Sequence, residues 1–303
     1  MPRERGERRV LQVSGAEGEA AGSNSTARTL AVLGSPIAHS KSPRLHAAAY
    51  RVLGLPWIYT AIEVVEGSLG AFVNTCDSSW RGLSLTMPLK REVLPMLASR
   101  SALVETVGAA NTVLFDDELG MHGFNTDVAG IVTALADHGV WALDSVRILG
   151  GGATAASVLA AVAQLGATRA LVEARDPGRA AALAPLAAHL GIDLTIARLG
   201  DQVGEADDSS GAVISTLPGS SEHGLTFSEE VRRGAVLLDV AYEPWPSELA
   251  RAWSAVGGTV VSGLEMLLHQ AIGQVRIFVT GAERGALPDE ERVVQAMRES
   301  VGL

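Results

Sequence analysis

Lysine is nearly absent from this chain of 303 residues, since only Lys41 and Lys90 occur among its 24 basic residues. All the other basic residues are arginine, whose guanidinium keeps its proton in proteins, whereas a lysine amine can lose one. A lysine kept in such a chain is therefore a candidate for proton transfer. The alternative is that a compositional bias removed most lysines and left these two by chance.

Cysteine and long apolar runs are also scarce. The single cysteine, Cys76, excludes an internal disulfide and any cysteine-cluster metal site, as is usual in a reducing compartment. No apolar run approaches the ~18 residues of a membrane-spanning helix, and no apolar signal region follows the N-terminus. We expect a cytoplasmic protein.

The charge and composition favour small-molecule partners. A net charge of -10 and an aromatic content of 4% argue against binding to nucleic acid or to an anionic membrane. The 47% hydrophobic content, rich in alanine and glycine, is typical of α/β enzymes, and the length allows two domains with a cleft between them. We expect a monomer or a homodimer.

Short strand-like segments alternate with helical ones from Thr29 onward, which predicts βαβ units on mainly parallel sheets. Residues 1–28 lack apolar periodicity and predict a disordered leader. The long last helix is expected to cross back to the first half of the chain. The predicted strands are 30–33, 57–64, 82–86, 113–115, 121–123, 145–149, 170–172, 194–197, 212–215, 236–240 and 259–261, and the main predicted helices are 45–53, 67–74, 128–138, 153–165 and 264–280.

A glycine-rich turn follows the strand 145–149 and opens a helix. Gly150-x-Gly152-x-x-Ala155 matches the dinucleotide fingerprint, in which the first glycine permits a tight turn and the second lets the backbone approach a pyrophosphate. A packing turn without a ligand is the alternative, but the strand-turn-helix context favours cofactor binding. We therefore predict a Rossmann-type doubly wound domain here.

The choice of cofactor depends on the segment that follows the next strand. Glu173 could accept hydrogen bonds from a ribose 2′-hydroxyl and favour NAD, whereas Arg175 and Arg179 could bind the 2′-phosphate of NADP. Two arginines in one short loop favour NADP, and NAD stays possible. The arginines could also be solvated charges at a helix start.

Two serines stand two positions apart after the first strand. If the segment is extended, the hydroxyls of Ser40 and Ser42 share a face and can hold both oxygens of a carboxylate. Alternatively, Ser42 is the N-cap of a helix that begins at Pro43. His39 and His46 are more consistent with packing or orienting roles than with metal binding, and we predict no metal site.

Lys90 and Asp127 form the candidate catalytic pair. Lys90 ends the strand-like run Gly82–Lys90 at a strand-to-helix corner, and Asp127 lies at the junction of the two predicted domains. Hydride reduction of a ketone leaves a developing alkoxide that needs a proton, which Lys90 could supply while Asp127 holds the amine in place. Without Lys90, Asp127 would be interpreted equally well as a helix N-cap.

These motifs together resemble those of the shikimate/quinate dehydrogenase family over nearly the whole chain from about Thr29. The resemblance is carried by Ser40-Lys41-Ser42-Pro43, Thr86-Met87-Pro88-x-Lys90, Ala110-Asn111-Thr112, Asn125-Thr126-Asp127, the glycine loop and Gly263-Leu264-x-Met266-Leu267-x-His269-Gln270. It implies NADP-dependent reduction of 3-dehydroshikimate to shikimate, in aromatic amino acid biosynthesis.

The resemblance also implies roles and boundaries. Residues 29–126 plus 263–303 would form the substrate-binding domain, and residues 127–262 the NADP-binding Rossmann domain. Lys90 and Asp127 would be catalytic. The implied substrate-binding residues are Ser40, Ser42, Thr86, Asn111, Tyr242 and Gln270, and the implied cofactor-binding residues are Gly150, Gly151, Gly152, Ala153, Thr154, Ala174, Arg175, Arg179, Val240, Gly263 and Met266.

Some positions depart from the commonest pattern of the family. Ser84 stands where asparagine is frequent, Ala47 where asparagine often follows His46, and Glu265 where glycine is usual. Asp176 would place a negative charge near a 2′-phosphate and weaken NADP preference. A quinate or aminoshikimate dehydrogenase, possibly NAD-dependent, is the nearest alternative. A non-catalytic ligand sensor is disfavoured because it would need no proton donor.

Overall fold

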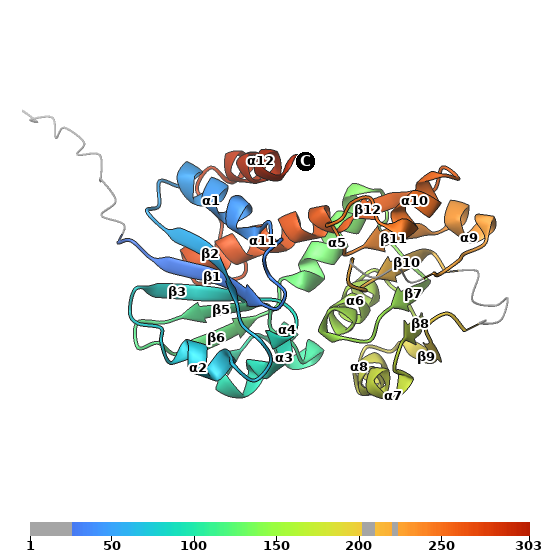
Figure 1. Ribbon diagram of the computed structural model, residues 1–303, viewed down its shortest axis with the longest axis horizontal. Coiled ribbons are helices and arrows are strands. Elements are labelled where there is room, and N and C mark those ends of the chain that lie inside the picture. The colour runs from blue at the N-terminus through green and yellow to red at the C-terminus, as the bar shows by residue number, and fades with distance from the viewer. Residues whose placement is uncertain (1–25, 202–209, 220–223) are drawn as a thin grey trace, which may run out of the picture.

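The computed structural model describes residues 26–201, 210–219 and 224–303, so most of the predicted leader lies outside the described residues. Two six-stranded sheets stand side by side, each with its own helices, and helices α5 (Asp127–Asp137) and α11 (Gly263–Thr280) run between them (Figure 1). The predicted fold class is confirmed: a mixed α/β chain with mainly parallel sheets, of which the second is doubly wound. None of the helices in the described ranges is long and apolar enough to cross a membrane.

The first sheet has the strand order β2-β1-β3-β5-β6-β4. Strand β1 pairs in parallel with β2 and β3. Strand β5 runs antiparallel to β3 and to β6, with which it forms a hairpin. Its strands are β1 (Thr29–Gly34), β2 (Ile58–Glu63), β3 (Trp80–Leu85), β4 (Ser99–Arg100), β5 (Thr112–Phe115) and β6 (Met121–Phe124), and the helices among them are α1 (Ser42–Val52), α2 (Leu69–Val73), α3 (Leu89–Glu92) and α4 (Ala102–Val107).

Alternation along β1 divides the first core into two layers. Leu30 and Val32 pack with α1, α11 and the C-terminal helix α12 (Glu290–Val301), while Ala31 and Leu33 pack with residues of α2 and α3 on the opposite face. Successive side chains of a strand point to opposite faces, so a sheet covered on both sides needs apolar residues at consecutive positions. The segment Leu30 to Leu33 meets this requirement.

The second sheet has the order β12-β11-β10-β7-β8-β9, and all of its pairs are parallel. The direction of winding reverses between β7 and β10, and ligands of such sheets bind at the carboxyl ends of the strands at this point. Its elements are β7 (Ser145–Leu149), α6 (Ala153–Gln164), β8 (Arg169–Ala174), α7 (Pro177–Ala180), α8 (Ala184–His189), β9 (Asp193–Arg198), β10 (Ala212–Ser215), α9 (Glu229–Gly234), β11 (Val236–Asp239), α10 (Glu248–Ser254) and β12 (Val260–Ser262).

Helix α11 joins the two sheets. It begins directly after β12, where the Ser262 hydroxyl accepts a hydrogen bond from the backbone of Leu264, and it continues into the core of the first sheet. Along its path it packs closely on α5, so a Cβ at Gly130 would lie only 3.0 Å from the backbone oxygen of Met266 in α11. The last helix predicted from the sequence therefore crosses back to the first sheet, as expected.

Candidate active site

A cavity of about 390 Å³ lies between the two sheets and takes its lining from both. Lys90, Asp127 and all the predicted substrate-binding residues line it, namely Ser40, Ser42, Thr86, Asn111, Tyr242 and Gln270. Of the predicted cofactor-binding residues, Thr154, Val240, Gly263 and Met266 line the cavity as well. The remainder do not line it and lie at the carboxyl ends of β7 and β8: Gly150, Gly151, Gly152, Ala153, Ala174, Arg175 and Arg179.

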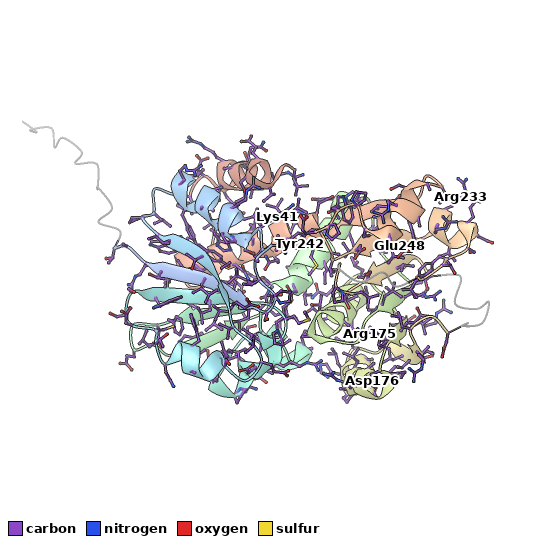
Figure 2. The ribbon with its side chains drawn as sticks, viewed as in Figure 1. Lys41, Arg175, Asp176, Arg233, Tyr242 and Glu248 are labelled. Carbon is purple, nitrogen blue, oxygen red and sulfur yellow. The ribbon has the colours of Figure 1, made fainter. Side chains whose placement is uncertain are left out.

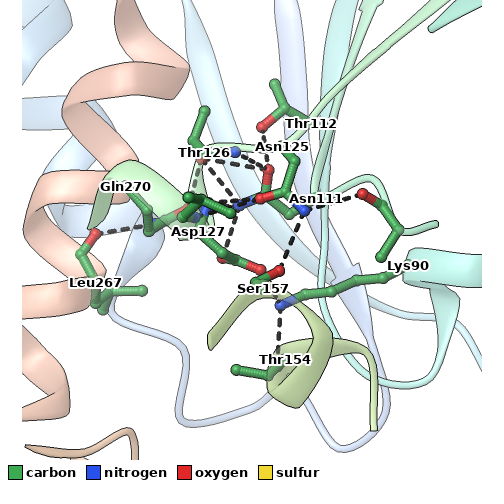
Figure 3. Close-up of polar contacts among 12 residues, drawn as sticks. Lys90, Asn111, Thr112, Asn125, Thr126, Asp127, Thr154, Ser157, Leu267 and Gln270 are labelled. Atoms are coloured by element: carbon green, nitrogen blue, oxygen red, sulfur yellow. Dashed lines mark hydrogen bonds and ion pairs between the residues drawn. The ribbon is translucent and has the colours of Figure 1, made fainter. Parts of the chain in front are cut away.

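Lys90 and Asp127, which both line this cavity, form a buried ion pair (Figure 3). The Lys90 Nζ donates to Asp127 Oδ2 at 2.7 Å, and Thr154 Oγ1 lies 3.4 Å from the same nitrogen. Lys90 belongs to helix α3, which follows strand β3 of the first sheet. Thr154 lies in the first turn of α6, directly after the glycine loop. The amine thus reaches from the first sheet to the helix that follows the glycine loop of the second.

The interpretation of Asp127 as only a helix cap is wrong. Thr126 occupies the N-cap of α5, and the Oδ1 of Asn125 accepts the backbone N–H groups of Asp127 and Val128, at 3.0 and 3.4 Å. The Asp127 carboxylate remains available to the cavity, where it accepts from Lys90 on Oδ2 and from Asn111 Nδ2 on Oδ1 at 2.8 Å. Donors on both oxygens hold the carboxylate in one orientation.

The Asn111 side chain is fixed by its own partners. Its Oδ1 accepts from the backbone N–H of Thr126 at 2.9 Å and from the hydroxyl of Thr112 at 2.8 Å. Because a backbone N–H can only donate, this contact assigns the oxygen of the amide and turns its NH₂ group toward Asp127. Gln270 Oε1 lies 3.3 Å from the same NH₂ group, and Gln270 Nε2 donates to the carbonyl of Leu267 at 2.9 Å.

Ser40, Ser42 and Tyr242 lie together on the cavity wall. The alternative that Ser42 caps a helix is wrong, since Lys41 occupies the N-cap of α1 and Ser42 is its first residue. Tyr242, which follows β11 of the second sheet, bonds to the Ser40 side chain and the Lys41 backbone, while burial raises the pKa of its phenol. The Lys41 ammonium lies 5.7 Å from the centre of its ring (Figure 2). Both serines therefore line the cavity together with a tyrosine that follows a strand of the opposite sheet.

Gln274, which the sequence analysis missed, joins a layer of buried polar residues at the cavity floor. Gln274 Oε1 lies 2.9 Å from the Ser84 hydroxyl and 3.2 Å from His46 Nε2, and the Tyr59 hydroxyl donates to Ser84 at 2.6 Å. Gln274 Nε2 donates to the carbonyl of Asn111 at 3.2 Å. Gln274 follows Gln270 by one helical turn, so the i, i+4 spacing on α11 was the signal that could have found it.

His46 belongs to this layer as a neutral side chain. Burial lowers the pKa of its imidazole to about 3. It stacks on Tyr59 with ring centres 3.8 Å apart, and its Nδ1 lies 3.0 Å from the Tyr50 hydroxyl. With Nε2 donating to Gln274, Nδ1 accepts from Tyr50. The ring orients its neighbours, and the described part of the chain contains no group of three acidic, histidine or cysteine side chains that could hold a metal ion.

The glycine loop has the geometry that a dinucleotide pyrophosphate needs. Gly150 has a φ of +107°, a conformation that L side chains rarely adopt, and a Cβ there would also collide with Thr216. At Gly152, the N-cap of the 12-residue helix α6, no atom lies within 4 Å of the position that a Cβ would take. Open space before the helix N-terminus fits a pyrophosphate on its backbone amides.

Glu173, the residue whose carboxylate could have favoured NAD by binding a ribose hydroxyl, is not available to a ribose. Its side chain is fully buried, and its two oxygens accept from Arg147 at 2.8 and 3.2 Å. Arg175 and Arg179, in contrast, are exposed just beyond β8, and neither forms an ion pair within the described residues. Their positions fit the 2′-phosphate of NADP.

Comparison with protein families and curated proteins gives consistent results. Residues 32–113 match the family described as "Shikimate dehydrogenase substrate binding domain". A shikimate dehydrogenase (NADP(+)) from Thermus thermophilus is 34% identical over 279 residues, which cover 90% of this chain and 98% of that protein.

Solved structures of this kind are similar over the same length. A shikimate 5-dehydrogenase from Mycobacterium fortuitum has 39% identity, a TM-score of 0.75, and coverage of 91% of this chain and 98% of that one. A shikimate 5-dehydrogenase from Thermus thermophilus in complex with NADP(H) and shikimate has 30% identity, a TM-score of 0.73, and coverage of 90% and 99%. A quinate dehydrogenase from Corynebacterium glutamicum in complex with NAD has 27% identity, a TM-score of 0.76, and coverage of 90% and 99%.

Proposed function

Since this chain belongs to the shikimate dehydrogenase family, we propose that it reduces 3-dehydroshikimate to shikimate, reversibly, with NADP as its cofactor. This is an oxidoreductase step of aromatic amino acid biosynthesis. The observation that carries the proposal is the buried pair of Lys90 and Asp127, 2.7 Å apart, in a cavity between the two sheets and beside Thr154 of the glycine-loop helix.

In the proposed reaction, Lys90 handles the proton. The glycine loop, Arg175 and Arg179 would hold NADPH, which would supply the hydride for the ketone carbon. The Lys90 ammonium donates a proton from Nζ to the ketone oxygen as negative charge develops there, and in the reverse direction the neutral amine removes that proton from the hydroxyl. Asp127 keeps Nζ at the site, and the Asn111 amide keeps the carboxylate from turning.

The remaining polar groups would position the substrate: one group would bind its carboxylate and the other its ring hydroxyls. We propose that Ser40, Ser42 and Tyr242 bind the carboxylate, because three hydroxyl groups line one wall. Thr86, Asn111 and Gln270 would bind the ring hydroxyls and place the ketone at Lys90 Nζ. Such positioning contributes to rate because the reacting groups are already aligned when the substrate binds.

We also propose the division of labour between the two halves. Residues 29–126 plus 263–303 would bind the substrate, and residues 127–262 would bind NADP through Gly150 to Thr154, Ala174, Arg175 and Arg179, with Val240, Gly263 and Met266 along the nicotinamide. The net charge of -10 supports small-molecule partners over nucleic acid. A cytoplasmic monomer or homodimer remains our proposal for location and assembly.

The rival functions have less support. The quinate dehydrogenase bound to NAD shares the fold at 27% identity, below the 39% of the mycobacterial shikimate dehydrogenase. An NAD preference is further disfavoured because Glu173 is occupied by Arg147. A non-catalytic sensor would have no use for a buried amine and carboxylate in its ligand cavity.

A steady-state assay grid tests the proposal. Shikimate and quinate are each supplied with NADP or NAD, and the ultraviolet absorbance of the reduced nicotinamide is followed. We expect the highest kcat/KM for shikimate with NADP. A strong preference for quinate with NAD would replace the proposal by the nearest rival, and the absence of turnover with every combination would favour the sensor.

A further inference from the structure

Asp176 raises a difficulty for NADP binding that the proposed function leaves open. In the sequence it stands between Arg175 and Arg179, the two side chains proposed for the 2′-phosphate, and Figure 2 shows it close to Arg175. Its carboxylate is the N-cap of α7 and accepts the backbone N–H of Arg179 at 3.1 Å, so it is held in the loop. A fixed negative charge there repels the phosphate and offsets part of the attraction of the arginines.

Arg198 brings a third guanidinium to the same loop from the neighbouring strand. Strand β9 pairs in parallel with β8, and the register places Arg198 opposite Ala174, the residue before Arg175. The Arg198 Nη1 donates to the backbone carbonyl of Arg175 at 3.4 Å, which keeps the guanidinium against the loop. Arg198 is exposed and forms no ion pair with another described residue.

We propose that Arg198 is a binding residue for the 2′-phosphate of NADP and sets the preference for NADP over NAD. This inference rests on the proposed NADP-dependent function. One of the five N–H donors of the guanidinium bonds to Arg175, and the others are free to form charge-assisted hydrogen bonds to phosphate oxygens. Arg198 therefore compensates for the charge of Asp176.

The charge balance supports this role. A phosphate monoester carries a charge of about -1.5 to -2 at neutral pH. With Asp176 in the loop, Arg175 and Arg179 alone leave a single excess positive charge, and Arg198 raises that excess toward the charge of the phosphate. Because NAD has a hydroxyl at this position, the contribution of Arg198 applies to NADP and not to NAD.

Direct binding of two adenosine nucleotides to the full chain tests the inference. The probes are 2′,5′-ADP, which carries the 2′-phosphate, and 5′-AMP, which lacks it, and calorimetry gives both dissociation constants. We expect R198A to raise the dissociation constant of 2′,5′-ADP about tenfold, which is the effect of losing one charge-assisted contact of ~1.4 kcal/mol. The dissociation constant of 5′-AMP should stay within twofold of the wild-type value.

R169A is the matched control. Arg169 is also exposed and begins β8, about 17 Å from the loop at the opposite end of the strand. The R169A substitution removes the same charge from the same sheet, so the dissociation constant of neither probe should change by more than twofold. Circular dichroism of both variants checks that they fold.

Two outcomes overturn the inference: an unchanged affinity of R198A for 2′,5′-ADP, or an equal loss for both probes. A wild-type chain that binds 2′,5′-ADP no better than 5′-AMP also overturns it. Failure of the proposed function has a different signature, because a chain that binds 2′,5′-ADP through Arg198 but oxidises neither shikimate nor quinate would keep the inference and lose the enzyme.

Discussion

The hydroxyl of Ser84 lies 2.9 Å from the amide oxygen of Gln274, although 190 residues separate them along the chain. The two side chains come from β3 and α11 and are 3% and 2% exposed. Ser84 is shorter than the asparagine that is frequent at its position, and the Gln274 amide lies beside it. Through its NH₂ group, Gln274 also bonds to Thr112 at 3.1 Å, so the floor of the cavity is connected to Asn111.

Replacing Gln274 by leucine should destabilise the protein. Gln274→Leu has similar volume but leaves Ser84, His46 and Thr112 buried without one partner each, and a buried unpaired polar group costs ~1–3 kcal/mol. We expect the free energy of unfolding in denaturant to fall by about 3 kcal/mol. Gln295→Leu, at an exposed position of α12, serves as the control and should change it by less than ~0.5 kcal/mol.

Replacing Lys90 by alanine should lower kcat far more than it raises KM for shikimate. Loss of a positioned acid-base group costs about 10²–10⁴ in rate, while the groups that we propose hold the carboxylate are unchanged. Steady-state kinetics measure both constants. Arg91→Ala removes an exposed positive charge from the next position and should leave kcat within twofold. Equal losses in kcat and in affinity, or no loss at all, would contradict the catalytic assignment of Lys90.

His46 should make the protein sensitive to mild acid. Its pKa is about 3 in the folded chain against 6.5 in the unfolded chain, so below pH 6.5 the unfolded state binds the extra proton. The stability contributed by neutral His46 is complete above pH 6.5 and is lost as the pH falls toward 3, by about 2 kcal/mol at pH 5.

The variant His46→Gln isolates this effect, since glutamine does not titrate. It should be less stable than the wild type at neutral pH, and the difference in unfolding free energy should narrow as the pH is lowered to 5. Denaturant unfolding at several pH values measures it. A difference that stays constant with pH would show that His46 titrates normally in the folded chain.

Glu173→Gln should lower stability and leave the cofactor preference unchanged. The substitution leaves the Arg147 guanidinium, whose side chain is 12% exposed, without its counter-charge, and breaking a buried pair costs about 3–5 kcal/mol. Glu229→Gln breaks the exposed pair with Arg233 and should cost less than ~1 kcal/mol. A shift in the ratio of kcat/KM for NADP and NAD in Glu173→Gln would mean that Glu173 contacts the ribose after all.

Tyr242→Phe should raise KM for shikimate about tenfold with a smaller effect on kcat. The phenylalanine keeps the ring beside Lys41 but loses the hydroxyl that bonds to Ser40 and that we propose binds the substrate carboxylate. KM for NADP serves as the internal control, because no cofactor contact is removed. An unchanged KM for shikimate would assign the carboxylate to other residues.

Most strands and the long helices could be predicted because their patterns are local. The apolar run of β1, the glycine loop before α6 and the amphipathic α11 each identify themselves within a short window of sequence. The C-terminal helix α12 was not predicted. Its sequence is rich in charged residues and places only Val293, Met297 and Val301 in the core, where they pack against α1.

The sequence motifs predicted the pairing of Lys90 with Asp127 and many of the residues that line the cavity, but not the partners that orient the other side chains. The pairing of Glu173 with Arg147 depends on the register of β7 and β8, and a carboxylate that follows a glycine loop has the same sequence signature whether it binds a ribose or an arginine. Asp127 is a plausible helix cap in the sequence, and only the hydrogen bonds show that Asn125 accepts the first backbone N–H groups of the helix instead. Long-range contacts of this kind require the fold.

Helices α5 and α11 connect the halves of the molecule side by side, and this arrangement limits how the halves can move. Because the two connecting helices lie next to each other, the halves can rotate about an axis through them as a hinge, but they cannot translate or twist freely relative to each other. Asp127 of α5 and Gln270 of α11 both lie on this hinge axis, so the distance between them would change little during a hinge rotation. Lys90 and Thr154 lie on opposite sides of this axis, as do Ser40 and Tyr242, so an opening motion would separate both pairs.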